Sequence, residues 1–191
     1  MRVHIKPTHQ IQRVNLLRNQ LEALKQKNST LFTIRPNEKA WCGAEVLKHM
    51  MVAQEIYTKK LDGALSKLKT INTEVDALKT KRIPSFLIKR FPPIDGEIRF
   101  KMKTSKQFKP TLDPSQLDAS QVDNLLKEMD HSLSQLLEWI EQTRFKNVAS
   151  IRFNSAIGPI VRFNASEACE FILCHNERHF HQLQRTLEAV S

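Results

Sequence analysis

The chain has 191 residues, of which 40% are hydrophobic and 26% are charged, and its formal net charge is +10. These values exclude an intrinsically disordered chain and leave room for one domain with a sizeable core. No apolar run is long enough to span a bilayer, and the N-terminus has no apolar signal core. Since the three cysteines lack the spacing of a disulfide framework, we expect a cytoplasmic protein with no membrane partner.

The positive charge is concentrated in one segment. Residues 79–109 contain ten lysines and arginines against Asp95 and Glu97, and so carry +8 of the chain's +10. A partner attracted by charge would meet this segment first. Its phenylalanines could stack on nucleic-acid bases, or they could turn to the core beneath a solvated loop. The second alternative is favoured, so nucleic acid is not the expected partner.

Two amphipathic helices are predicted in the first part of the chain. The first runs from about His9 to Lys27, where apolar residues recur at spacings of three and four. The second begins near Gly43 and runs to about Thr70. His49 lies within the apolar stripe of this second helix, so its imidazole is expected to face the core.

Helix signals fail between residues 81 and 114, because prolines interrupt the pattern at positions 84, 92, 93, 110 and 114. We expect no helix here. Residues 80–113 should instead form an extended segment that wraps across the helices. Its expected anchors are apolar: Phe86, Leu87, Phe91, Ile94, Phe100 and Phe108.

The third helix has two candidate starts. It begins either at Pro114, capped by Asp113, or at Gln121, capped by Ser120. Its apolar stripe continues to about Arg144, where the helix is expected to end.

The C-terminal part of the chain predicts an irregular stretch followed by a last helix. Residues 151–164 read as an extended lead-in or an irregular hairpin. Asn164 and Glu167 form a capping pair for a helix from Ala165 to about Ala189. Four amphipathic helices predict an all-α fold, a four-helix bundle with a long basic crossover segment between the second and third helices. We expect a single domain over residues 1–191.

Three histidines suggest a metal site. His175 and His179 are four residues apart in the last helix, which places both imidazoles on one face. Such a pair can share a divalent ion, and His49 could reach it across the about 8–10 Å between neighbouring helix axes. The alternative is three separate core histidines, each with its own hydrogen bond. Gln182 shares the face of the pair and could hydrogen-bond a ligand.

Further side chains are candidates for a pocket around these histidines. Glu45 and Tyr57 lie one turn before and two turns after His49, and each could line the pocket. The alternatives are a solvated carboxylate and a packed ring. Arginines could hold an anionic substrate or cofactor, and the candidates are Arg152, Arg162 and Arg178.

The sequence resembles the DinB/YfiT-like superfamily, whose members are regarded as metalloenzymes. Trp41 followed eight residues later by His49 is similar to the first signature of that superfamily. Residues 167–183, which contain His175 and His179, are similar to the second. The resemblance covers nearly the whole chain and implies a four-helix bundle, often a homodimer. It also implies that the three histidines hold a divalent ion, commonly nickel, zinc or iron.

The resemblance further implies a metal-dependent enzyme that acts on a small molecule. Activities in the superfamily include transfer of low-molecular-weight thiols to electrophiles, maleylpyruvate isomerisation and suggested hydrolysis. The ion could lower the pKa of a thiol or water and so generate a thiolate or hydroxide. No residue stands out as a general base. The alternative is a non-catalytic interaction protein with a structural or vestigial metal site, which binds an acidic partner or nucleic acid through residues 79–109.

Overall fold

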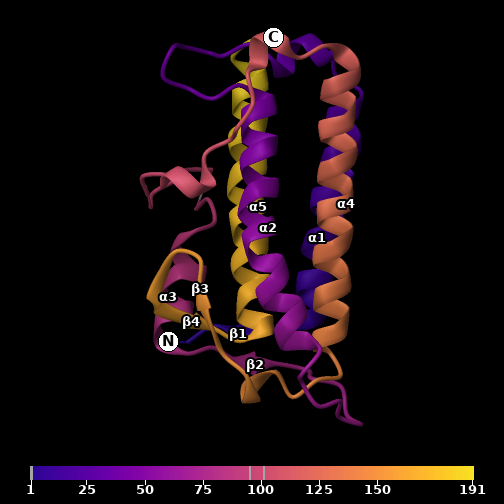
Figure 1. The fold of residues 1–191 in the computed structure, drawn as a ribbon, viewed down its shortest axis with the longest axis vertical. Helices are drawn as coiled ribbons and strands as arrows, with labels where there is room; N and C mark the ends of the chain where they lie inside the picture. The colour runs from indigo at the N-terminus through magenta and orange to yellow at the C-terminus, as the bar shows by residue number, and fades with distance from the viewer. Residues whose placement is uncertain (1, 95, 101) are drawn as a thin grey trace.

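The computed structural model describes residues 2–94, 96–100 and 102–191, so that Asp95 and Lys101 of the basic segment lie outside the description. Within these ranges the fold is an all-α four-helix bundle, as predicted. Its long helices run side by side in Figure 1. They are α1 (Pro7–Lys25), α2 (Gly43–Leu65), α4 (Ala119–Thr143) and α5 (Ala165–Glu188).

The apolar stripes of these helices meet in one core. Helix α2 packs against α4 and α5, and α1 packs against the same two helices. The side chains at the centre are fully buried, among them Leu21, Leu47, Met50, Leu61, Met129, Leu133, Leu136 and Leu173. Across the described ranges, no helix combines the length and apolarity that a membrane crossing requires.

Capping boxes set the starts of α4 and α5. Asp118 accepts the backbone N–H of Gln121, and the Gln121 side chain accepts the backbone N–H of Asp118, so α4 begins at Ala119. Both predicted starts were therefore wrong. Residues 114–116 form only a 3-10 turn, and Asp118 rather than Ser120 caps α4. Asn164 and Glu167 make the predicted reciprocal pair at the start of α5.

Helix α2 ends at Leu65, about one turn before the predicted end. The chain then turns away from the helix axis. Thr70 forms an antiparallel bridge with Lys146, and the backbone N–H of Ile71 donates to the carbonyl of Phe145. Pairing with the segment after α4 therefore ends the helix before its apolar pattern does.

The crossover contains a helix that the sequence pattern did not predict. Helix α3 (Arg82–Arg90) includes Pro84 in its first turn. Proline is tolerated there because a first-turn N–H has no intrahelical partner. Leu87 and Ile88 are buried, and α3 packs against α5. The expectation of no helix between residues 81 and 114 was wrong.

The expected anchors of the crossover divide into two groups. Phe91 and Leu87 are buried, and Phe100 and Phe108 are half-buried. Phe86 is 49% exposed and Ile94 39% exposed, so these two are not anchors. After α3, two 3-10 turns (Lys106–Phe108 and Pro114–Gln116) lead to α4.

Short antiparallel pairs complete the fold. β1 (His4–Ile5) pairs with β2 (Leu78–Lys79). β3 (Phe153–Ser155) pairs with β4 (Gly158–Phe163) in a hairpin whose register is irregular between Asn154 and Ser155, which confirms the hairpin alternative for this stretch. Figure 1 shows α3, the hairpin and the β1–β2 pair at one end of the bundle.

Candidate metal centre

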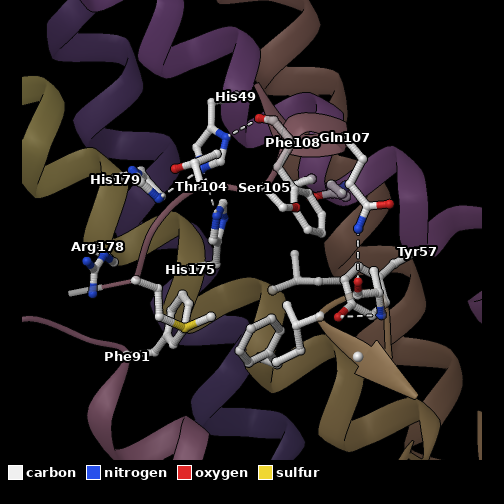
Figure 2. A pocket seen from close by; sticks show the side chains of 18 of the residues that line it. His49, Tyr57, Phe91, Thr104, Ser105, Gln107, Phe108, His175, Arg178 and His179 are labelled. Atoms are coloured by element: carbon white, nitrogen blue, oxygen red, sulfur yellow. Dashed lines mark hydrogen bonds between the residues drawn. The ribbon is translucent and has the colours of Figure 1, made fainter. Parts of the chain in front are cut away.

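Two helices bring the three predicted imidazoles together. His49 projects from α2, and its Nε2 atom lies 3.2 Å from the Nε2 atoms of both His175 and His179 on α5. One nitrogen from each ring fits within a 4.8 Å span. Figure 2 shows the rings directed toward one another. His49 and His179 are buried, and His175 is partly exposed.

The outer nitrogens of two rings are hydrogen-bonded, which fixes their protonation. His49 Nδ1 lies 2.6 Å from the carbonyl oxygen of Phe108. A carbonyl can only accept, so this nitrogen carries the proton. His179 Nδ1 likewise donates to Oε1 of Gln182 at 2.8 Å. In the neutral rings, Nε2 of His49 and of His179 therefore both hold lone pairs.

This protonation pattern fits a shared metal ion. The Nε2 atoms of His49 and His179 are 3.2 Å apart. Because both carry lone pairs and neither carries a proton, they cannot form a hydrogen bond with each other. Tetrahedral ligation at about 2.0–2.1 Å would place two nitrogens about 3.3 Å apart. Ligating histidines also commonly donate their other N–H to a backbone carbonyl, a carboxylate or water, and here the acceptors are a backbone carbonyl and the Gln182 side-chain oxygen. The donor set thus suits a divalent ion.

The electrostatics of the site favour neutral imidazoles. Burial lowers the pKa of His49. Burial, followed by the nearby His49, lowers the pKa of His179 to about 3. Burial, then His179 and His49, holds the pKa of His175 well below its ordinary value. Neutral imidazole is the form that binds a metal, so the rings are ready for ligation at neutral pH.

A cavity of about 470 Å³ opens beside the triad. Its walls come from α2, α5, Phe91, residues 102–105, 107 and 108 of the crossover, and residues 156–158 at the turn of the hairpin. Figure 2 shows the labelled lining residues of α2, α5 and the crossover around one space. Arg178 and Lys103 are charged lining residues, and no described carboxylate lines the cavity. The space therefore favours neutral or anionic ligands.

Comparison with known proteins places the chain in a family. The model of the DinB superfamily matches residues 14–183, a range that contains all three histidines. The chain belongs to the DinB superfamily. No curated protein sequence and no solved structure gives a significant match. In this DinB-superfamily chain, the ring of Trp41 packs beside His49 with its centroid 4.9 Å away.

Three of the other predicted residues lie at the site. Gln182 contacts His179 as described. Tyr57 lines the cavity with its ring buried. Arg178 also lines the cavity, donates to the carbonyl oxygen of Phe100 at 2.6 Å and lies over the ring of Phe91 at 5.3 Å. Its guanidinium is held near the triad.

Glu45 lies elsewhere, at the N-terminus of α2. It accepts the backbone N–H of Cys42 at 3.0 Å and forms an ion pair with Arg35 at 2.6 Å. Burial alone would raise the pKa of Glu45, but the hydrogen bonds from Arg35 and Cys42 outweigh it and lower the pKa. Glu45 thus caps a helix, and it is not among the described residues that line the cavity.

Arg152 and Arg162 brace the hairpin and do not line the cavity. Arg152 forms an ion pair with buried Glu167 at 2.8 Å, and each arginine donates to the other's backbone carbonyl. Their guanidinium groups are therefore already engaged in holding β3 and β4 to each other and to the start of α5. Their predicted role in substrate binding finds no support in these contacts.

Sequence reasoning missed much of the crossover wall. Residues 102–105 and 107 line the cavity, and the Phe108 carbonyl orients His49. Gln107 donates to the Ala156 carbonyl at 3.1 Å and so ties the crossover to the hairpin. Nothing in the residue types of this stretch indicates these contacts, because two of them are made by backbone carbonyls.

Proposed function

We propose that this DinB-superfamily chain is a divalent-metal-dependent enzyme that acts on a small molecule bound in the cavity. The observation that carries the proposal is the convergence of the three Nε2 atoms, with the Nδ1 atoms of His49 and His179 donating outward. Such an arrangement leaves lone pairs aimed at one point beside an accessible space. His49, His175 and His179 would hold the ion, and nickel, zinc or iron suits imidazole ligands.

The reaction class we propose is transfer of a low-molecular-weight thiol to an electrophile, or hydrolysis. A divalent ion at the triad would lower the pKa of a coordinated thiol or water. The lower pKa would produce the thiolate or hydroxide nucleophile of either reaction without a separate general base. No carboxylate is found among the described residues that line the cavity, so none of these side chains offers a carboxylate base.

The protein's own residues would bind and orient the reactants. Phe108 and Gln182 fix the rings of His49 and His179, so the ligand geometry is formed before substrate arrives. Arg178 lines the cavity, and none of the described carboxylates forms an ion pair with it. Its guanidinium is available to an anionic group of the thiol or substrate. Phe91 and Phe171 would exclude water from the reacting atoms.

Metal analysis of protein purified without a His-tag tests the metal site. We expect a stoichiometric transition metal, present on purification or taken up on loading with nickel, zinc or iron. His49→Ala should lose it because the triad then has two ligands. His131→Ala is the matched control, since that imidazole is exposed on α4. A wild-type protein that takes up no ion, and whose stability His49→Ala leaves unchanged, would contradict the proposal.

A screen of thiols against model electrophiles, with metal-loaded protein, tests the reaction class. We expect turnover that His175→Ala abolishes and that His131→Ala retains. A screen of ester and amide substrates covers hydrolysis. Activity that persists in His175→Ala would show that the triad is not involved.

Two further predictions concern assembly and location. The homodimer follows from the family resemblance and is tested by light scattering of the purified chain. The cytoplasmic location follows from the composition and is tested by fractionation of cells that express the chain.

A further inference from the structure

The cavity has a second polar end, away from the triad. Tyr57 lies eight residues after His49 on α2, which is about 12 Å along the helix axis. Its ring is 2% exposed, and it lines the cavity near residues 156–158 of the hairpin turn. Figure 2 shows Tyr57 and the triad on opposite sides of the space. The cavity therefore joins two polar groups.

At this far end, Tyr57 and Ser155 form a hydroxyl pair. Their oxygens are 2.6 Å apart. The backbone N–H of Ala156 donates to the Tyr57 oxygen at 3.3 Å, and that of Ile157 donates to the Ser155 oxygen at 3.2 Å. Each oxygen thus already accepts one backbone proton.

Counting the hydroxyl protons leaves one unused. The pair has two such protons, and the bond between the oxygens uses one of them. No other described group accepts from either oxygen. Either hydroxyl can donate in this bond; when Ser155 donates to Tyr57, the unused proton belongs to Tyr57, which lines the cavity, whereas Ser155 does not. In that arrangement the Tyr57 proton has no acceptor among the described protein groups and is free for a ligand in the cavity that Tyr57 lines. Burial raises the pKa of Tyr57 to about 12, which keeps the proton on the oxygen at neutral pH.

The walls between the two ends are mostly apolar, although Gln54, which lies on α2 between His49 and Tyr57, also lines the cavity. Helices α2 and α5, the crossover and the hairpin each contribute to them, through Ala53, Phe91, Phe171, Ile172 and Ile157. Apolar side chains of this kind favour a hydrocarbon or aromatic body in the ligand. A ligand with an apolar body and a polar group at each end therefore matches most of the lining.

We propose that the cavity binds an elongated molecule with an apolar body and a polar group at each end, and that Tyr57 donates a hydrogen bond to an acceptor oxygen at the end remote from the triad. The inference rests on the proposed metal site, which anchors the first end. It adds the substrate class, a chain or ring system with a carbonyl, carboxylate or ether oxygen opposite its reactive group. It also makes Tyr57 the residue that selects for substrate length.

Probes with a thiol at one end test the inference. One series carries a carboxamide at the other end, and the matched series carries an isopropyl group of the same shape, each over graded chain lengths. Binding is measured through the cobalt–thiolate absorption of cobalt-loaded protein. At one chain length, we expect the carboxamide probe to bind wild-type protein about three- to tenfold more tightly than its partner, the value of one hydrogen bond.

Two variants separate hydrogen-bond donation from a structural role. Tyr57→Phe should erase the preference for the carboxamide, because the donor is gone. Ser155→Ala should keep it, because the Tyr57 proton remains free. An equal loss in both variants would assign Tyr57 to bracing the hairpin and overturn the inference. Circular dichroism confirms that both variants are folded.

The wild-type series can overturn the inference without any variant. A cobalt–thiolate band with no carboxamide preference at any chain length would overturn it and leave the metal site standing. No band with any probe would instead overturn the proposed function, and the inference would fall with it.

Discussion

The two walls of the cavity are held in different ways. On one wall, α2 and α5 pack against each other along their length and supply the three histidines. On the other wall, the part of the crossover that follows α3 is attached by hydrogen bonds from His49 to Phe108, from Gln107 to Ala156 and from Arg178 to Phe100. Two of these bonds come from residues at the site. The crossover wall is thus attached to the site that it covers, and changes to each wall should have different consequences.

The largest expected change is a loss of folding stability when the packing of the helical wall is disturbed. Leu173 on α5 is fully buried, and Leu173→Ala should lower the free energy of unfolding by about 2–5 kcal/mol because it leaves a cavity in the core. Leu16→Ala, at a position that is 60% exposed on α1, should change it by less than about 0.5 kcal/mol. Urea denaturation measures both. Similar values for the two variants would show that the bundle core does not hold the helical wall.

The next largest change is expected in metal affinity, with the free energy of unfolding little changed. Gln182→Ala removes the acceptor that orients His179, and it should weaken metal binding by about 10- to 100-fold with little change in unfolding. Gln184→Ala, also half-buried on α5, is the control. Calorimetric titration with zinc measures the affinities. If both variants bind zinc as wild type does, Gln182 has no orienting role.

A smaller change in folding stability is expected at the N-terminus of α2, and its size depends on pH. The folded-state pKa of Glu45 is below its ordinary value, so its contribution to stability is present above the unfolded carboxyl pKa of roughly 4.3. It is lost as pH falls through the lower folded-state value. Glu45→Gln should therefore cost about 1 kcal/mol at neutral pH and less in acid.

Urea denaturation at several pH values measures this difference between Glu45→Gln and wild type. Glu38→Gln, at an exposed position before α2, is the control and should show no such dependence. A cost for Glu45→Gln that stays constant from neutral pH to acid would rule out the ionised carboxylate as the source of the stabilisation.

The contrast between the walls also explains what could be predicted from the sequence. His175 and His179 are placed by a spacing of four on a helix, and His49 by its position in an apolar stripe, so local periodicity brought the site residues to the right faces. The bundle followed from the same periodicity. Glu45 was misplaced because a carboxylate three residues into a helix can serve as a cap or face a pocket, and spacing does not distinguish these roles.

The crossover could not be predicted in the same way. Helix α3 was missed because Pro84 reads as a helix breaker unless the helix start is known. The contact between Phe108 and His49 uses a carbonyl that every residue possesses. The exposure of Phe86 depends on which face of α3 meets α5. These features are decided by tertiary docking, which a single sequence does not specify.

The crossover wall can be weakened without changing the helices. Gln107→Ala removes the hydrogen bond to the Ala156 carbonyl, and we expect at most about a tenfold loss of zinc affinity, since one hydrogen bond is removed and its effect reaches His49 only through the chain to Phe108. Gln116→Ala, exposed outside the cavity, is the control. A loss as large as that of Gln182→Ala would mean that the crossover positions the ligands as firmly as the helices do.

The weakest interaction is expected with nucleic acid, despite the positive charge of residues 79–109. Stacking on bases would require free phenylalanine rings, but Phe91 and Phe108 line the cavity, and the ring of Phe100 packs against those of Phe86 and Phe91. Arg90 lies over Phe86 at 4.5 Å. We therefore expect only weak retention on DNA, lost with modest salt and unchanged by Phe86→Ala. Retention that survives salt and falls in Phe86→Ala would mean that the crossover binds nucleic acid as well as covering the cavity.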